Sequence, residues 1–324
     1  MRLTYKSLDD SIADRLDSFF NKNNSFIEVN PGNVIMPRLF QDIGDEVLSF
    51  NVRQDDVWMV SYPRTGSTWA QEMIWLLANN LNYEGAKHLQ QLRSPLLELS
   101  AYFQEDHNTW LKSNMGTSVK LTQSLPSPRF IKSHLPWQLL PKNLSTVNPK
   151  IIYIARNAKD TCVSFYHYLS LIHKVVGSFE EFCNLFLEDN LVCGSMWKHM
   201  LGFWNHRNDT NILFLKYEDM KKDLRGAIYQ CAEFLNVSHK LNDEEVSRMC
   251  AHLNFDKMQR NRAVNLEALY NPNGDETDEK NSVKFIRKGQ IGDWKNYMSD
   301  EMSERFDEWI ERNSYGTGLS FEYN

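Results

Sequence analysis

The chain has few cysteines, and their spacing offers neither a metal site nor a disulfide framework. The number of cysteines is five, which is odd, and no two of them form a Cys-x-x-Cys pair. Zinc modules and small secreted domains need regularly paired cysteines, so both classes are disfavoured. We expect instead a protein of a reducing compartment, cytoplasmic in location and without a metal. The five residues are Cys162, Cys183, Cys193, Cys231 and Cys250.

The chain also lacks long hydrophobic runs and an excess of positive charge. Residues 1–6 open no apolar segment, which predicts that there is no signal peptide, and no stretch approaches the length of a membrane span. The formal net charge of -6 over 324 residues argues against a nucleic-acid-binding or membrane-surface protein. A polyanionic ligand would therefore have to be held by local clusters of Arg and Lys.

The most informative pattern is a strand, a short loop and a helix between residues 57 and 78. Val57–Tyr62 is apolar and β-prone, which predicts a buried strand, and apolar residues at helical spacing predict a helix from Trp69 onward. This arrangement directs backbone N–H groups and a helix dipole at an anion, and Gly66 allows close approach. The loop is not a Walker A sequence, because no Gly opens it and no Lys follows Gly66. A plain strand-to-helix turn is the alternative for this stretch alone.

Residues 62–69 resemble the 5′-phosphosulfate loop of the cytosolic sulfotransferases. They read Tyr-Pro-Arg-Thr-Gly-Ser-Thr-Trp, where the family usually has Tyr-Pro-Lys-Ser-Gly-Thr-Thr-Trp. Members of this family use 3′-phosphoadenosine 5′-phosphosulfate (PAPS) as sulfuryl donor and release PAP. The hydroxyls of Ser67 and Thr68 are expected to bond the anion or to cap the helix. The resemblance implies donor-binding roles for Arg64, which replaces the usual Lys, and for Thr65, Gly66, Ser67, Thr68 and Trp69.

A second segment supplies candidate catalytic residues at the end of a short predicted strand. Lys132 and His134 alternate with Ser133, so both side chains should face the same side of an extended segment. Open α/β folds place ligands at such strand ends, although a lone His is more often structural. The segment resembles the family's Lys-Thr-His-Leu-Pro, in which the His is the catalytic base. The resemblance implies that His134 is the base and that Lys132 and Arg64 stabilise developing charge.

Two further segments resemble the family's 3′-phosphate site. A β-branched run at 151–155 predicts a strand buried on both faces, followed by a helix capped by Asn157 or Asp160. Taken alone, its terminal Arg would more often pair with a carboxylate. Residues 287–294 match the family's Arg-Lys-Gly-x-x-Gly-Asp-Trp. The resemblance assigns the 3′-phosphate to Arg156, Ser164, Arg287, Lys288 and Gly289.

The adenine contacts are implied less specifically. Tyr217 opens a Tyr-Glu-Asp sequence after a predicted strand at 212–216, and Phe255 lies in a stretch similar to the family's Thr-Ser-Phe-Lys-x-Met. Phe255 can stack on a base, and with Trp69 and Tyr217 it is expected to enclose the adenine. The acidic pair Glu218 and Asp219 leaves a rival interpretation open, in which it holds magnesium for a phosphotransferase.

Weaker signals concern the acceptor and the assembly. We predict helices at 9–20, 40–50 and 222–235 and a strand at 34–37, and in the family residues 1–56 lie at the mouth of the acceptor pocket. Leu and aromatic residues between 96 and 111 are equally consistent with an ordinary core and with an apolar pocket wall. An acidic, turn-rich stretch at 271–280 is expected to be a mobile loop. In the family's dimer motif an Asp, Asp300, stands where the family has Val, so a homodimer by that route is doubtful.

Together these patterns predict one α/β domain covering residues 1–324, with the motifs in a core at 57–300. The fold class is a mainly parallel central sheet flanked by helices on both sides, related in topology to P-loop nucleotide kinases. The predicted function is transfer of a sulfuryl group from PAPS to a small hydrophobic hydroxyl compound such as a phenol, steroid or retinoid, with no metal. The alternatives are the magnesium-dependent phosphotransferase and a family relative, as in some insect members, whose net reaction dehydrates an alcohol such as retinol.

Overall fold

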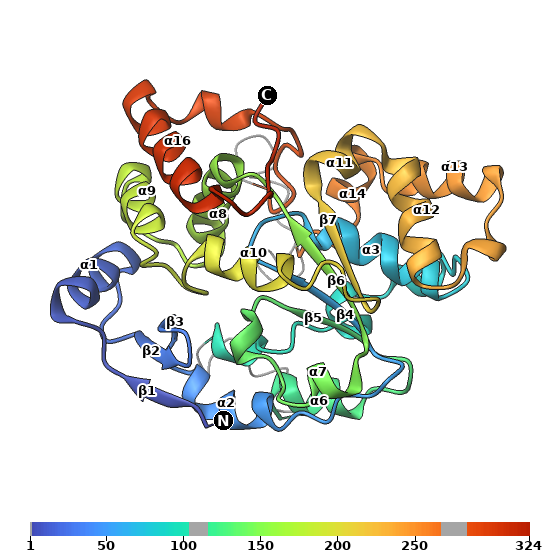
Figure 1. Ribbon diagram of the computed structural model, residues 1–324, viewed down its shortest axis with the longest axis horizontal. Coiled ribbons are helices and arrows are strands. Elements are labelled where there is room, and N and C mark those ends of the chain that lie inside the picture. The colour runs from blue at the N-terminus through green and yellow to red at the C-terminus, as the bar shows by residue number, and fades with distance from the viewer. Residues whose placement is uncertain (1, 104–115, 267–283) are drawn as a thin grey trace.

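Four parallel strands form the central sheet of the computed structural model, which describes residues 2–103, 116–266 and 284–324 (Figure 1). β4 pairs with β5 on one side and with β6 on the other, and β7 pairs with β6. Because these strands run in one direction, their carboxyl ends share one edge of the sheet. The predicted parallel sheet is confirmed. Across the sheet the order is β5 (Phe130–Ser133), β4 (Val57–Ser61), β6 (Lys150–Ala155) and β7 (Ile212–Lys216).

Both faces of the sheet are buried. Along β4, Trp58 and Val60 join one apolar cluster, whereas Met59 between them joins the other. This alternation follows from the two-residue period of a strand, and it explains why the strand sequences are apolar throughout. One cluster is covered by α8 (Ala158–Ile172), α9 (Phe179–Leu187), α10 (Met196–Trp204) and α16 (Asp300–Ser314), and the other by α3 (Ser67–Ala78), α12 (Leu224–Phe234), α13 (Asp243–His252) and α14 (Phe255–Arg260) (Figure 1).

The N-terminal region forms a separate antiparallel sheet that packs onto the first cluster. The helices predicted there are confirmed as α1 (Asp10–Phe20) and α2 (Phe40–Leu48), and the strand at 34–37 as β3 (Val34–Pro37). β1 (Thr4–Lys6) and β2 (Phe26–Asn30) were not predicted. They are short, and β1 exists through its pairing with β2, which is a tertiary contact rather than a local signal.

The helix predicted at 222–235 is present as α12, but it begins later than predicted, at Leu224. Residues 217–234 form two helices, α11 (Tyr217–Lys222) and α12, separated at Asp223. The Asp223 carboxylate accepts a hydrogen bond from the Gly226 N–H at 2.8 Å and so caps the second helix. The remaining described elements are η1 (Gly85–Lys87), α4 (Gln90–Arg93), η2 (Leu99–Ala101), α6 (Ser118–Ser124), η4 (Trp137–Leu139), α7 (Leu144–Val147), η5 (Ser238–Lys240) and η7 (Asp293–Asn296).

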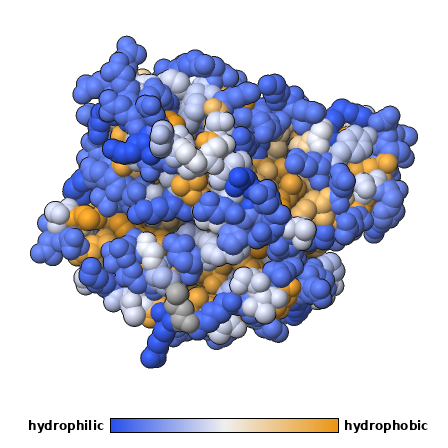
Figure 2. All heavy atoms as spheres, viewed as in Figure 1, coloured by the Kyte–Doolittle hydropathy of each residue, from blue (hydrophilic) through white to orange (hydrophobic). Residues whose placement is uncertain are grey.

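The surface drawn in Figure 2 is largely hydrophilic, with apolar atoms showing between the raised polar areas. No helix in the described part of the chain has the length and apolar character needed to cross a membrane. The acidic stretch at 271–280, and Trp110 and Leu111 of the predicted pocket wall, lie outside the described residues.

Candidate active site

The loop between β4 and α3 turns on two residues in the left-handed region. Arg64 has φ 71° and Gly66 has φ 98°. A Cβ at Gly66 would lie 2.5 Å from Cδ2 of Tyr217, so this position requires glycine for space as well as for conformation. Gly66 is also the N-cap of α3, and no side chain of the described residues caps this helix end. The expectation that Ser67 or Thr68 caps α3 is therefore wrong: both lie in its first turn, beside amides that an anion can use.

Thr65 fastens the loop to the sheet. Its buried hydroxyl lies 2.8 Å from the carbonyl oxygen of Ile154, at the end of β6, and 3.0 Å from that of Tyr62. A hydroxyl engaged by these carbonyls is not directed at a ligand. Thr65 can therefore contribute its backbone N–H to an anion, while its side chain holds the loop in shape.

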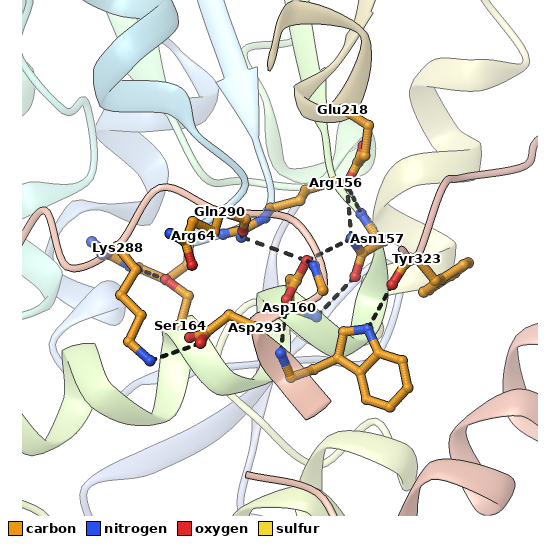
Figure 3. A network of polar contacts seen from close by, with 12 residues as sticks. Arg64, Arg156, Asn157, Asp160, Ser164, Glu218, Lys288, Gln290, Asp293 and Tyr323 are labelled. Carbon is orange, nitrogen blue, oxygen red and sulfur yellow. Dashed lines mark hydrogen bonds and ion pairs between the residues drawn. The ribbon is translucent and has the colours of Figure 1, made fainter. Parts of the chain in front are cut away.

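Arg64 places a guanidinium beside α8. Its Nε donates to the hydroxyl of Ser164 at 3.3 Å, and its Nη2 donates to the carbonyl oxygen of Phe285 at 2.8 Å (Figure 3). The rings of Tyr168 and Phe285 lie 5.1 and 4.5 Å from the guanidinium carbon. Burial lowers the pKa of Arg64 to about 10, with Arg156 and Arg287 adding repulsion. The group remains a cation at neutral pH, and the hydroxyl and the carbonyl oxygen to which it donates are neutral.

His134 is held in one tautomer. Its Nδ1 lies 2.8 Å from the carbonyl oxygen of Ser61 at the end of β4. Because a carbonyl oxygen only accepts, Nδ1 carries the proton and Nε2 is left as the basic nitrogen. Burial, reinforced by the charge of Lys132, lowers the pKa of His134 well below its ordinary value of 6.5. The imidazole is therefore neutral at physiological pH, as a general base must be.

Glu98 supports this strand end and was not identified from the sequence. The segment before it is bonded to β5, because the Leu97 N–H donates to the Lys132 carbonyl oxygen at 2.9 Å. The Glu98 carboxylate then accepts from the His134 N–H at 2.6 Å and from the Ser133 hydroxyl at 3.0 Å. The exposed fraction of Glu98 is 0%. A lone Glu in a leucine-rich stretch gave no signal, because its partners are far away in sequence.

Glu98 and Lys132 shift each other's ionisation. Burial raises the pKa of Glu98 to about 7, while hydrogen bonds from His134 and Ser133 oppose that rise. Burial and the nearby charge of Arg64 lower the pKa of Lys132 to about 8, and Glu98 opposes that fall. The two groups thus titrate close to neutral pH, as groups in active sites commonly do.

Arg156 follows β6 and begins a network that joins α8 to the C-terminal segment (Figure 3). Its Nη2 donates to the Gln290 carbonyl oxygen at 2.9 Å and lies 3.8 Å from the carboxylate of Asp160. The carboxylate of Asp160 also accepts from the backbone N–H groups of Gly292 and Trp294. Asn157, not Asp160, caps α8 through its side chain. The Nε of Arg156 is buried and has no partner among the described residues.

Arg287 and Lys288 share one carboxylate. Asp293, which is 4% exposed, accepts from Arg287 Nη2 at 2.5 Å and from Lys288 Nζ at 2.8 Å. One carboxylate cannot neutralise two cations, so this turn retains positive charge. A Cβ at Gly289 would lie 2.4 Å from the ring of Phe255, so the turn and that ring are in close contact.

The three aromatic residues expected around the adenine are brought to the same cavity. Trp69 and Tyr217 form an edge-to-face pair with ring centroids 5.7 Å apart. The Trp69 indole N–H donates to the Leu253 carbonyl oxygen at 2.9 Å, which fixes the ring close to the start of α14. Phe255, the first residue of α14, lines the same cavity with both of them.

One continuous cavity joins all the sequence-predicted site residues except Thr65. Its volume is about 380 Å³, within the usual range for small-molecule sites. Among the described residues that line it, none is Asp or Glu, although the chain as a whole is acidic. The cations on its wall are Lys22, Arg38, Arg64, Lys132, Arg156, Lys221, Arg287 and Lys288.

The half of the cavity away from the loop at residues 64–68 is largely apolar. Side chains from the N-terminal region, from η2 and from α8 form its wall. Some of the Leu and aromatic residues of the 96–111 stretch are therefore pocket wall rather than core alone. The apolar lining residues are Phe20, Phe26, Leu39, Leu96, Leu99, Ala101, Phe103, Phe165, Leu169 and Val192.

The acidic pair after β7 separates in the structure. Glu218 is buried, and its Oε1 accepts from the Asn157 backbone N–H at 2.8 Å, whereas Asp219 is exposed. Neither residue lines the cavity. In the described ranges, no three His, Cys, Asp or Glu residues are grouped as metal ligands would be. The carboxylate of Glu218 thus has a structural partner at the start of α8.

Comparison with known proteins identifies the family of the chain. The family model described as a sulfotransferase domain matches residues 54–318. Firefly (Photinus pyralis) luciferin sulfotransferase is 34% identical over 95% of this chain and 84% of its own length. Rabbit (Oryctolagus cuniculus) amine sulfotransferase is 38% identical over 80% of each chain. The protein belongs to the sulfotransferase family, and the resemblance seen in its sequence is confirmed.

Solved structures give the same result. A crystal structure of retinol dehydratase in a complex with retinol and PAP superposes with a TM-score of 0.88 and 29% identity, covering 99% of both chains. A mouse sulfotransferase complexed with PAP superposes with a TM-score of 0.68 and 25% identity, covering 89% of this chain and 95% of the other. The fold, a single α/β domain with a parallel central sheet, is that of sulfotransferase enzymes.

Proposed function

We propose that the protein transfers a sulfuryl group from PAPS to the hydroxyl of a small hydrophobic acceptor. The observation that carries this proposal is the composition of the cavity wall. Eight cations line it together with aromatic rings that include Trp69, Tyr217 and Phe255, and none of its described lining residues is Asp or Glu. A nucleotide with phosphates at both its 3′ and 5′ positions suits that wall. The buried Nε of Arg156, which has no partner among the described residues, and the close Tyr217–Gly66 contact also suit a site shaped for such a ligand.

The donor would be held by two groups of residues. Arg64 and the main chain of Thr65, Gly66, Ser67 and Thr68 would hold the phosphosulfate. The 3′-phosphate would be held by Arg156, Ser164, Arg287, Lys288 and Gly289, and the adenine by Trp69, Tyr217 and Phe255. When bound, PAPS supplies an activated sulfuryl group. The acceptor would occupy the apolar half of the cavity, with its hydroxyl near His134.

Each catalytic role would then fall to a particular residue of this chain. Nε2 of His134 accepts the proton of the acceptor hydroxyl, and the Nδ1 bond to Ser61 keeps the ring in the required tautomer. Arg64 and Lys132 stabilise negative charge at the reacting group. Glu98 positions the backbone at His134 and keeps Lys132 protonated. Arg64 contributes by hydrogen bonding and charge, because a guanidinium does not give up a proton at neutral pH.

A direct assay tests the proposal. The purified protein is incubated with labelled PAPS and a panel of phenols, steroids and retinoids, and products are identified by mass. We expect a product heavier by one sulfuryl group with at least one acceptor, and loss of that product in His134→Ala while PAP still binds. Failure of every acceptor together with failure of PAP to bind would contradict the proposal.

A second candidate outcome is favoured by the close superposition on retinol dehydratase. If the acceptor is an alcohol whose sulfate ester can leave with formation of a conjugated double bond, transfer followed by loss of bisulfate amounts to removal of water. The same assay separates the two outcomes, because the product then is lighter than the acceptor by one water and inorganic sulfate is released. A cytoplasmic location, the absence of nucleic-acid and membrane partners, and a weakened dimer contact at Asp300 stay predictions.

A further inference from the structure

The cavity has three cations that are not assigned to the donor or to catalysis: Lys221, on α11 with the donor-binding Tyr217, and two from the N-terminal region. Lys22 and Arg38 line it from the N-terminal region, Lys22 just after α1 and Arg38 just after β3. The donor-binding residues come from α3 and the loop before it, from α8 and Arg156 before it, from α11 and α14, and from the turn at 287–289. In Figure 1, α1 and β3 lie on the opposite side of the sheet from α11 and α14. The two N-terminal cations therefore come from a part of the fold that supplies none of the donor-binding residues.

Arg38 forms hydrogen bonds but no ion pair with the residues that the structure describes. Its Nε donates to the Asn24 carbonyl oxygen at 2.6 Å, and its Nη2 bonds the side-chain oxygen of Asn24 and the carbonyl oxygen of Phe26. All three acceptors are neutral. These bonds hold the guanidinium in a defined position on the cavity wall. They leave its positive charge available to an anionic ligand.

Lys22 has a similar position. It is half-buried, lines the cavity, and takes part in no ion pair recorded among the described residues. Asp17, the acid at the end of α1, is engaged by the backbone N–H of Asn24 at 2.6 Å. Lys22 and Arg38 thus form a positive patch on the cavity wall, which we call the N-terminal rim. The other lining residues of this region are the polar Asn23, Asn24 and Ser25 and the apolar Phe20, Phe26, Pro37 and Leu39.

We propose that the N-terminal rim binds a carboxylate on the acceptor. The preferred acceptor is then a molecule with a hydroxyl at one end, an apolar middle and a carboxylate at the other end. This inference rests on the proposed function, because it takes the hydroxyl end to be the end at His134. A hydrogen bond between ionised partners contributes enough to tighten binding by about 10- to 100-fold.

The test compares two ligands that differ only in this charge. The protein is first saturated with PAP, so that the donor-site cations are occupied. It is then titrated calorimetrically with ω-hydroxylauric acid and with the primary amide of that acid. We expect the acid to bind at least about tenfold more tightly than the amide. In the double variant Lys22→Gln/Arg38→Gln, we expect the two ligands to bind nearly equally.

Three controls make the outcome specific. Lys22→Arg and Arg38→Lys keep the charge and should keep the preference for the acid. Lys6→Met removes a positive charge from exposed β1, outside the cavity, and should leave the preference unchanged. The proposal is overturned if wild type binds acid and amide alike, or if the double variant keeps the full preference. Failure of PAP to bind in the first step would instead contradict the proposed function.

Discussion

The two halves of the cavity differ in how the chain builds them. The donor half uses charged and small residues at fixed points: the turns after β4, β5 and β6, the start of α3 and the turn at Gly289. The acceptor half uses apolar side chains from β2, η2, α8 and the segments between them. Charge recognition needs particular residue types at strand ends and helix starts, whereas an apolar wall can be made from many residue combinations. A change in one half should therefore alter one ligand and spare the other.

The largest expected effect belongs to the residue between the halves. His134→Ala should lower kcat by about 10²- to 10⁴-fold, because the acceptor loses its base. PAP affinity should stay close to that of wild type, since the donor cluster is untouched. Single-turnover kinetics and a PAP titration measure the two quantities separately. Near-normal turnover in this variant would remove His134 from the mechanism.

Arg64 should show the next largest effect. Arg64→Ala removes a cation from the site and should lower kcat by about 10²- to 10³-fold. Arg64→Lys restores a cation and should retain or raise activity, because a Lys can also give a proton to a leaving oxygen. Full activity in Arg64→Ala, measured under saturating donor, would refute the role.

Two variants, one in each half of the cavity wall, test whether the halves bind separate ligands. Phe255→Leu should weaken PAP binding by roughly one to two orders of magnitude if its ring stacks on the adenine. Leu99→Ala should raise the acceptor KM several-fold and leave PAP affinity unchanged, because Leu99 lies in the apolar half. If each variant weakened both ligands equally, the two halves would not be separate recognition sites.

The smallest effect concerns pH. Lys132 loses its charge as the pH rises through about 8, so kcat/KM should fall on the alkaline side. The Glu98 anion opposes that loss, and Glu98→Gln keeps the shape of the side chain while removing its charge. The alkaline limb should then move to lower pH. A purely structural role for Glu98 would reduce activity without moving the limb.

Several parts of the fold and of the site were predictable because they depend on local sequence. The β-branched run 151–155 is too apolar for anything but a strand buried on both faces, and the loop at Gly66 carries a recognisable order of residue types. The sequence also predicted that His134 and Lys132 face the same side of a strand end, which follows from strand geometry, and both line the cavity.

Other parts depend on contacts between distant segments and had no local signal. β1 exists through its pairing with β2, and Glu98 gains its role from Ser133, the last residue of β5, and from His134, which follows it. Asp293 was seen only as part of a motif, although it is the carboxylate that holds Arg287 and Lys288. Thr65 was predicted to bind the donor, and its sequence position gave no sign that its hydroxyl bonds to the carbonyl groups of Tyr62 and Ile154.

The most direct test of the account is a pair of calorimetric titrations, one with PAP and one with adenosine 5′-phosphate, which lacks the 3′-phosphate. Several cations converge where that phosphate should lie, so PAP should bind at least about 100-fold more tightly, and Arg287→Ala should remove much of the difference. Equal affinities for the two nucleotides, or no binding of either, would contradict the claim that this cavity is a PAPS site.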